Sequence, residues 1–331
     1  MERFALAAAV VLGFALTAAL CSLFVPLRRV LERREQQQQP VQSEQPRPAP
    51  LHAPLWGGLC AAAGTVAAVG VGWLAACVGQ PELLGSEGRL MTRLLTALAG
   101  SLAFGAVGLA EDLARMRSPA ALGLRRDVRL LLEALAAAFV LLLLRAAGCL
   151  PRGLGVPGAG YVLLGSAVPF LWAVLMVALA ECARIAERDE GAVCGAAFVA
   201  MLALMMVEAG LGVSGLAVLP GALAGALVAL GLWAFPPARL GVGCCGSLLA
   251  AGAVGCIPLS LDMTSLTVPL ALPFWAAGGL LAAQLLCAKR TGKPLRCWVK
   301  KHKMSPETVF LCSFALSAVG YVLALALLRW C

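Results

Sequence analysis

Residues 212–234 of this chain, GVSGLAVLPGALAGALVALGLWA, contain no charged side chain. A helix needs about 20 apolar residues to cross a bilayer, so this stretch predicts a transmembrane helix. Segments of the same kind recur along the sequence, and about ten are expected, or eight if the least distinct ones merge. They lie near residues 4–27, 57–78, 94–110, 130–148, 161–180, 192–208, 212–234, 248–259, 265–287 and 308–328.

The composition is that of an integral membrane protein. Of the 331 residues, 61% are hydrophobic and 13% are charged, and the mean hydropathy is +0.90. Too few polar residues remain to cover a water-soluble surface. We therefore predict an all-α, polytopic membrane protein with one integral-membrane domain over residues 1–331. Residues 28–56, rich in glutamine and proline, are expected to form a flexible cytoplasmic loop.

The distribution of lysine and arginine predicts how the spans are oriented. Cytoplasmic loops retain positive charge, and all but six of the 26 basic residues fall in five alternate loops. The exceptions are Arg3, Arg89, Arg93, Arg145, Arg152 and Arg329. We expect a multi-pass plasma-membrane protein with five cytoplasmic loops and both termini extracytoplasmic. This bias explains most of the net charge of +9, so the bilayer is an expected partner and a nucleic acid is not.

Two adjacent carboxylates mark the inner end of the third apolar segment. Glu111 and Asp112 are followed by Arg115. Proteins usually hold Mg²⁺ with one or two carboxylates together with the phosphate oxygens of a substrate, so this segment is a candidate for both. A solvated helix end with a local ion pair is the alternative.

A second acidic cluster occupies the third cytoplasmic loop. On a helix, Glu187 and Glu190 share one face, and Glu181, Arg184 and Arg188 lie near it. Such a cluster can position a metal and a nucleotide, or it can be an ordinary salt-bridged helix end.

The last cytoplasmic loop, residues 291–303, is strongly basic. It contains Lys300, Lys301 and His302. A diphosphate would be attracted to this loop, and so would any anionic membrane surface.

Taken in order, five segments resemble the signatures of the polyprenyl-phosphate N-acetylhexosamine-1-phosphate transferases, most closely the phospho-N-acetylmuramoyl-pentapeptide transferase branch. The segments are Pro54-Leu55-Trp56-Gly57-Gly58; residues 108–115 with Gly123-Leu124; residues 181–191; residues 234–239 with Gly243-Cys244-Cys245-Gly246-Ser247; and Thr291-Gly292-Lys293. The resemblance extends over nearly the whole chain. It implies ten membrane helices with the active site on the cytoplasmic loops.

The resemblance also implies a reaction. A polyprenyl-phosphate oxygen attacks the β-phosphate of a UDP-sugar and releases UMP, with Mg²⁺ as cofactor. Undecaprenyl phosphate and a UDP-sugar are the implied partners, and a homodimer is left open. The implied catalytic residues are Glu111, Asp112, Glu187 and Glu190, with Asp112 and Glu190 as metal ligands. The implied substrate-binding residues are Trp56, Gly57, Gly58, Arg115, Lys300, Lys301 and His302.

The chain departs from the family pattern at residues that carry the chemistry. Glu187 and Glu190 stand where the family has aspartates, and Cys244 stands where it has a Mg²⁺-contacting aspartate. Only His302 remains of three histidines. A cysteine thiol, with a pKa of about 8.5, is mostly neutral at pH 7 and is a soft ligand. Loss of one preorganised charged contact costs about 3 kcal/mol, or about a hundredfold in rate.

We therefore expect a catalytically impaired homologue with a binding or regulatory role. One alternative is an active transferase that relies on Glu111, Asp112, Glu187 and Glu190. Another is an unrelated membrane transporter, whose mark would be ionisable residues in the middle of its spans.

Overall fold

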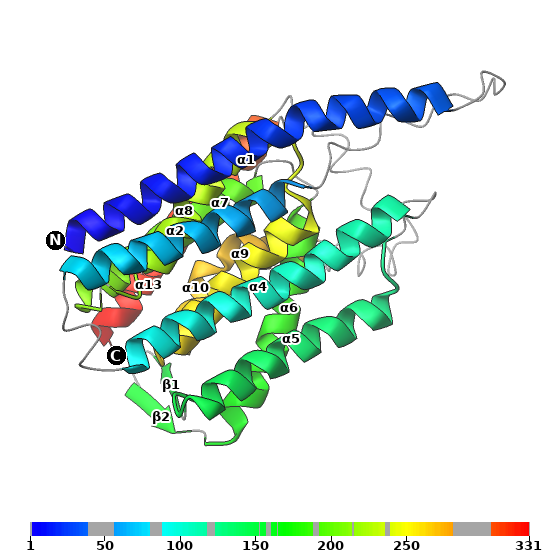
Figure 1. The fold of residues 1–331 in the computed structure, drawn as a ribbon. Helices are drawn as coiled ribbons and strands as arrows, with labels where there is room; N and C mark the ends of the chain where they lie inside the picture. Colours follow the sequence, from blue (N-terminus) through cyan, green and yellow to red (C-terminus); the bar gives the residue numbers. More distant parts are fainter. Residues whose placement is uncertain are drawn as a thin grey trace.

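A computed structural model of the chain describes residues 2–38, 56–79, 88–117, 123–151, 153–156, 160–163, 165–187, 192–213, 215–235, 239–280 and 306–330. These residues are almost entirely helical, and the long helices form one bundle (Figure 1). The long helices are α1 (Glu2–Gln38), α2 (Gly57–Gly79), α4 (Gly88–Arg117), α5 (Arg126–Ala146), α6 (Ala167–Ala186), α7 (Ala192–Gly210), α8 (Val218–Ala234), α9 (Gly243–Ser260) and α13 (Pro306–Trp330). Two short helices, η1 (Thr264–Leu266) and α10 (Thr267–Leu270), follow α9.

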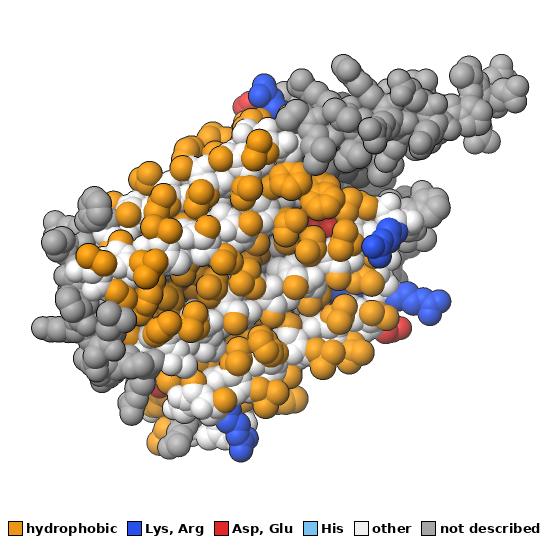
Figure 2. All heavy atoms as spheres, in the orientation of Figure 1, with side chains coloured by type: hydrophobic (Ala, Val, Ile, Leu, Met, Phe, Trp, Pro, Cys, Tyr) orange, Lys and Arg blue, Asp and Glu red, His pale blue; other side chains and the backbone are white. Residues whose placement is uncertain are grey.

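Seven of the described helices are long and apolar enough to cross a membrane: α1, α2, α4, α6, α7, α9 and α13. Helix α8 is apolar but shorter. Hydrophobic side chains are spread over the face shown in Figure 2, and most of the charged side chains visible there lie toward its margins. Such a surface suits lipid rather than water, as expected of a multi-pass membrane protein. The number of spans and the side on which each loop lies stay predictions.

The all-α prediction needs one correction. Strands β1 (Gly153–Val156) and β2 (Gly160–Leu163) pair as an antiparallel hairpin. The span predicted from residue 161 therefore begins only at Ala167, where α6 starts. Glycines are frequent in this stretch and disfavour helix. The Tyr161 hydroxyl lies 3.0 Å from a carboxylate oxygen of Asp262, and this contact ties the hairpin to the turn after α9.

The first helix also differs from its predicted boundaries. A span over 4–27 followed by a loop from residue 28 was expected, but α1 continues to Gln38. Residues 28–38 are mainly Arg, Leu, Glu and Gln, which are good helix formers, and the first proline after them is Pro40. The change from apolar to polar residues therefore ends the apolar segment without ending the helix.

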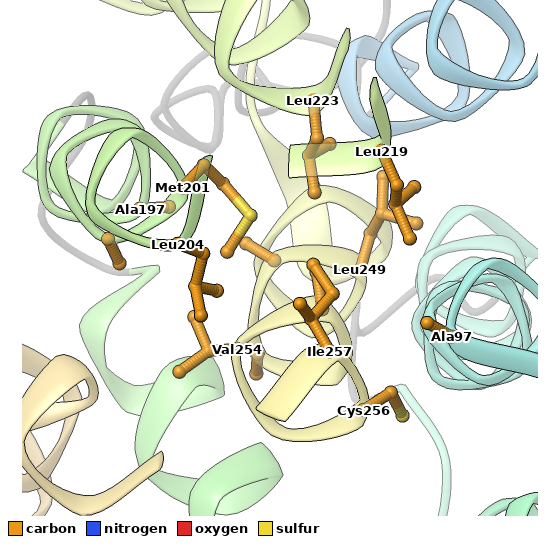
Figure 3. Packing of buried hydrophobic residues seen from close by; sticks show 14 of the residues in the cluster. Ala97, Ala197, Met201, Leu204, Leu219, Leu223, Leu249, Val254, Cys256 and Ile257 are labelled. Atoms are coloured by element: carbon orange, nitrogen blue, oxygen red, sulfur yellow. The ribbon is translucent and has the colours of Figure 1, made fainter. Parts of the chain in front are cut away.

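Helix α9 lies at the centre of the bundle. Every residue from Gly243 to Ser260 is buried, and the helix packs against α2, α4, α6 and α7. Figure 3 shows side chains of α4, α7 and α8 gathered around it. The span predicted at 248–259 was too short, because Gly243–Ser247, which lie outside the predicted span, form the first turns of this helix. The N-terminal end of α9 is where the candidate site is built.

Candidate functional site

Asp112 holds the N-terminal end of α9. Its two carboxylate oxygens accept the backbone N–H groups of Cys244 at 3.0 Å and Cys245 at 2.9 Å. The first N–H groups of a helix have no partner within the helix and carry partial positive charge, so a carboxylate satisfies them well. Asp112 is fully buried and reaches this position from α4. It thereby joins two segments that are 132 residues apart in sequence.

Two glycines allow α2 and α4 to approach the start of α9. A Cβ atom on Gly58 would collide with the backbone of Cys245 and Gly246, and one on Gly108 would collide with the backbone of Cys244. Both glycines belong to segments that sequence analysis selected. Their structural task here is close helix contact, which residues without a side chain permit.

Glu187 and Cys244 complete a compact group with Asp112. The Cys244 thiol donates a hydrogen bond to Oε2 of Glu187, with an Sγ to oxygen distance of 2.8 Å. One ligand atom from each of Asp112, Glu187 and Cys244 lies within 4.8 Å of the other two. We call these three residues the carboxylate–thiol group. Glu187 follows the last residue of α6, so the group joins α4, α6 and α9.

Arg115 supplies the nearest positive charge. Its guanidinium lies 2.9 Å from Glu111, 3.4 Å from Glu187 and 3.9 Å from Asp112. Glu111 is buried, and its second carboxylate oxygen, Oε2, has no hydrogen-bond partner among the described residues. One cation is therefore shared by three carboxylates in a poorly hydrated region.

A second charged network lies beside the first, and sequence analysis missed part of it. Arg129 of α5 contacts Glu181 at 2.7 Å and Glu111 at 3.7 Å, and Arg184 contacts Glu181 at 2.8 Å. Glu133, one turn after Arg129, is fully buried, and neither of its carboxylate oxygens has a described partner. Charged residues four positions apart at the start of an apolar segment were the available signal for Arg129 and Glu133.

The other predicted site residues fall into two sets. Trp56 stacks on Phe24 of α1, with ring centroids 5.8 Å apart, and Gly57 lies close to the backbone of Gly241. These contacts place the start of α2 against α1 and against the residues just before α9. Glu190, Lys300, Lys301 and His302 lie outside the described residues. Their roles, like the catalytic roles of the residues described above, stay predictions.

Magnesium is the cation that the resemblance implies, and the carboxylate–thiol group suits it poorly. Mg²⁺ takes oxygen ligands in near-ideal octahedral geometry, whereas a thiol is a soft donor. Each Asp112 oxygen already accepts one N–H group, which leaves a lone pair on each for a cation. Asp112 and Glu187 could serve as ligands, but Cys244 fills the third position with sulfur.

Comparison with known proteins identifies the family. A sequence profile of glycosyl transferase family 4 matches residues 94–262, just over half of the chain. No curated protein matches the chain. The matched region runs from α4 to the turn after α9, so it includes all three residues of the carboxylate–thiol group. The chain therefore belongs to glycosyl transferase family 4, a family that includes polyprenyl-phosphate sugar-phosphate transferases.

Proposed function

We propose that this protein is a diverged transferase homologue that binds a lipid phosphate or a sugar nucleotide and transfers phospho-sugar weakly or not at all. Its ligands would be undecaprenyl phosphate and a UDP-sugar such as UDP-N-acetylmuramoyl-pentapeptide. The observation that carries the proposal is the hydrogen bond from the Cys244 thiol to Glu187 beside Asp112. The acidic frame of the site is present, but one ligand position holds a neutral, soft group.

The chemistry of phosphoryl transfer explains why this matters. Positioning and charge neutralisation by Mg²⁺ supply most of the catalysis in such reactions. In this chain, Arg115 contacts the same carboxylates that a cation would neutralise. A site that holds Mg²⁺ weakly therefore loses the main contribution to the rate of transfer, while the helices around the site keep their positions.

Binding has separate support. Arg117, Arg125 and Arg126 are exposed at the end of α4 and the start of α5, close in sequence to the buried cluster. Arginines recognise phosphate oxygens through paired N–H groups. These residues belong to loops that the charge distribution predicts to be cytoplasmic, where a nucleotide substrate would be available. A phosphate-bearing ligand is therefore favoured at this end of the bundle.

The test is an assay of UMP release from UDP-N-acetylmuramoyl-pentapeptide, with undecaprenyl phosphate, Mg²⁺ and the full chain in detergent micelles. The wild-type chain should release UMP at the rate of Asp112→Asn or only slightly faster, while equilibrium binding of the sugar nucleotide or the lipid phosphate is detectable. Cys244→Asp should raise Mg²⁺-dependent release by about a hundredfold if its carboxylate is the missing contact. Cys312→Ser, at an exposed position of α13, serves as the matched thiol control and should change nothing.

The competing function is an active transferase that uses Glu111, Asp112, Glu187 and Glu190. Convergence of Glu111, Asp112 and Glu187 is the observation that favours it. Rapid wild-type release that Asp112→Asn abolishes would establish this alternative and refute impairment. Membership of the family is incompatible with the other alternative, a transporter unrelated to the transferases.

A further inference from the structure

We propose that Asp112, Glu187 and Cys244 bind a thiophilic divalent cation of the zinc class. The proposal goes beyond the function proposed above, because a cation can bind this group without lipid or nucleotide. It gives a function to Cys244, which stands where the family resemblance implies an aspartate and which would otherwise only remove a carboxylate from the site. Three observations support it: the geometry of the donors, the uncompensated charge around them and the chemical class of the set.

The donor atoms are already close enough to surround an ion. They lie within 4.8 Å of one another on side chains that are buried or nearly so. Around a tetrahedral zinc ion, a sulfur and a carboxylate oxygen are about 3.6 Å apart, given typical bond lengths and angles. The distance from Cys244 Sγ to the Glu187 oxygen is 2.8 Å, so zinc binding requires these two atoms to separate by only about 0.8 Å. Glu187 lies at the end of α6, where side-chain rotation can supply that change.

The charge around the group is not balanced. Glu111, Asp112 and Glu187 all contact the guanidinium of Arg115, and its shortest contact is to Glu111. Arg129 is the next cation; it lies 3.7 Å from Glu111, but its closer contact, at 2.7 Å, is to Glu181. Buried carboxylates without full compensation are costly. A divalent cation that replaces the thiol proton would add one net positive charge here.

The chemical class of the donors selects the type of cation. Zinc accepts thiolate sulfur and carboxylate oxygen, and three protein ligands leave a fourth position for water or a phosphate oxygen. Mg²⁺ and Ca²⁺ take oxygen donors. The replacement of an aspartate by Cys244 therefore shifts the preference of the site from hard cations to borderline and soft ones.

Cobalt and zinc titrations of the full chain in detergent micelles test the proposal, with no lipid phosphate or nucleotide present. Co²⁺ should produce a near-ultraviolet sulfur-to-cobalt charge-transfer band, and an equimolar amount of Zn²⁺ should abolish it. A large excess of Mg²⁺ should leave the band in place. Because no transferase substrate is involved, the result is independent of whether the protein binds or transfers a phospho-sugar.

Matched variants localise the ion. Cys244→Ala should remove the band and weaken Zn²⁺ binding at least about tenfold. Cys245→Ala, which removes the neighbouring thiol outside the group, should leave the band and the Zn²⁺ affinity as in the wild-type chain. Cys244→Asp should lose the band and gain affinity for Mg²⁺ relative to Zn²⁺. Thermal unfolding of each variant checks that the fold is retained. A cobalt band that is absent, that persists in Cys244→Ala, or that disappears only in Cys245→Ala would overturn the proposal.

Discussion

At the scale of single residues, the end of the bundle that contains the carboxylate–thiol group also contains two charged residues of α5 with opposite effects on stability. Arg129 and Glu133 lie one turn apart on α5, and both are buried. Arg129 contacts two carboxylates, whereas both oxygens of Glu133 lack a described partner. A buried polar group without a partner costs about 1–3 kcal/mol, whereas breaking a buried ion pair costs about 3–5 kcal/mol.

We therefore expect Glu133→Leu to raise the free energy of unfolding by about 1–3 kcal/mol. Arg129→Leu should lower it by about 3–5 kcal/mol, because it removes a partner from Glu181 and from Glu111. Reversible unfolding of the purified chain in mixed micelles measures both. Leu135→Ala, at an exposed position of the same helix, is the control. Destabilisation by Glu133→Leu would show that this carboxyl has a favourable partner.

At the scale of elements, the first turn of α9 depends on its contacts with α2 and α4. Asp112 provides the hydrogen-bond acceptors, while Gly58 and Gly108 provide the space. Cys244 owes its position to this arrangement, because its backbone N–H is held by α4 while its thiol faces Glu187. The geometry of the carboxylate–thiol group therefore depends on helix packing as much as on the ligand residues.

This dependence predicts that Gly58→Ala destabilises the protein by about 1–3 kcal/mol, since its Cβ would meet the backbone of α9 rather than a mobile side chain. Gly70→Ala provides the control in the same helix. A Cβ there has no atom within 4 Å, and replacing glycine by alanine in a helix stabilises by about 0.5–1 kcal/mol. Unfolding midpoints in micelles compare the two variants. Equal effects at both positions would mean that α9 does not pack against Gly58 as described.

At the scale of the whole molecule, the bundle has two different ends. Both ends of the chain lie at one of them, together with the β1–β2 hairpin (Figure 1). The C-terminal end of α4 and the start of α9 lie at the other, where Asp112 joins them. This arrangement agrees with the charge distribution, which predicts that the site faces the cytoplasm and the termini do not.

The orientation can be measured by labelling introduced cysteines with a membrane-impermeant maleimide. Arg125→Cys, exposed at the start of α5, should react only after cells are permeabilised. Leu163→Cys, exposed in the hairpin, should react in intact cells. The wild-type chain gives the background from its own thiols. Labelling of both positions in intact cells would contradict the predicted orientation.

The sequence by itself determined the membrane class, the family resemblance and most of the helical segments, because hydropathy and signature residues are local properties of the chain. It also selected Glu111, Asp112, Glu187 and Cys244 as candidates. It missed Glu133 because one carboxylate barely changes the apolar character of its segment. Only the tertiary structure decided that Gly243–Ser247 begin a helix, since the acceptor for its N–H groups is 132 residues away. The contact between Cys244 and Glu187 was likewise decided by packing, because no local pattern specifies which helix ends meet.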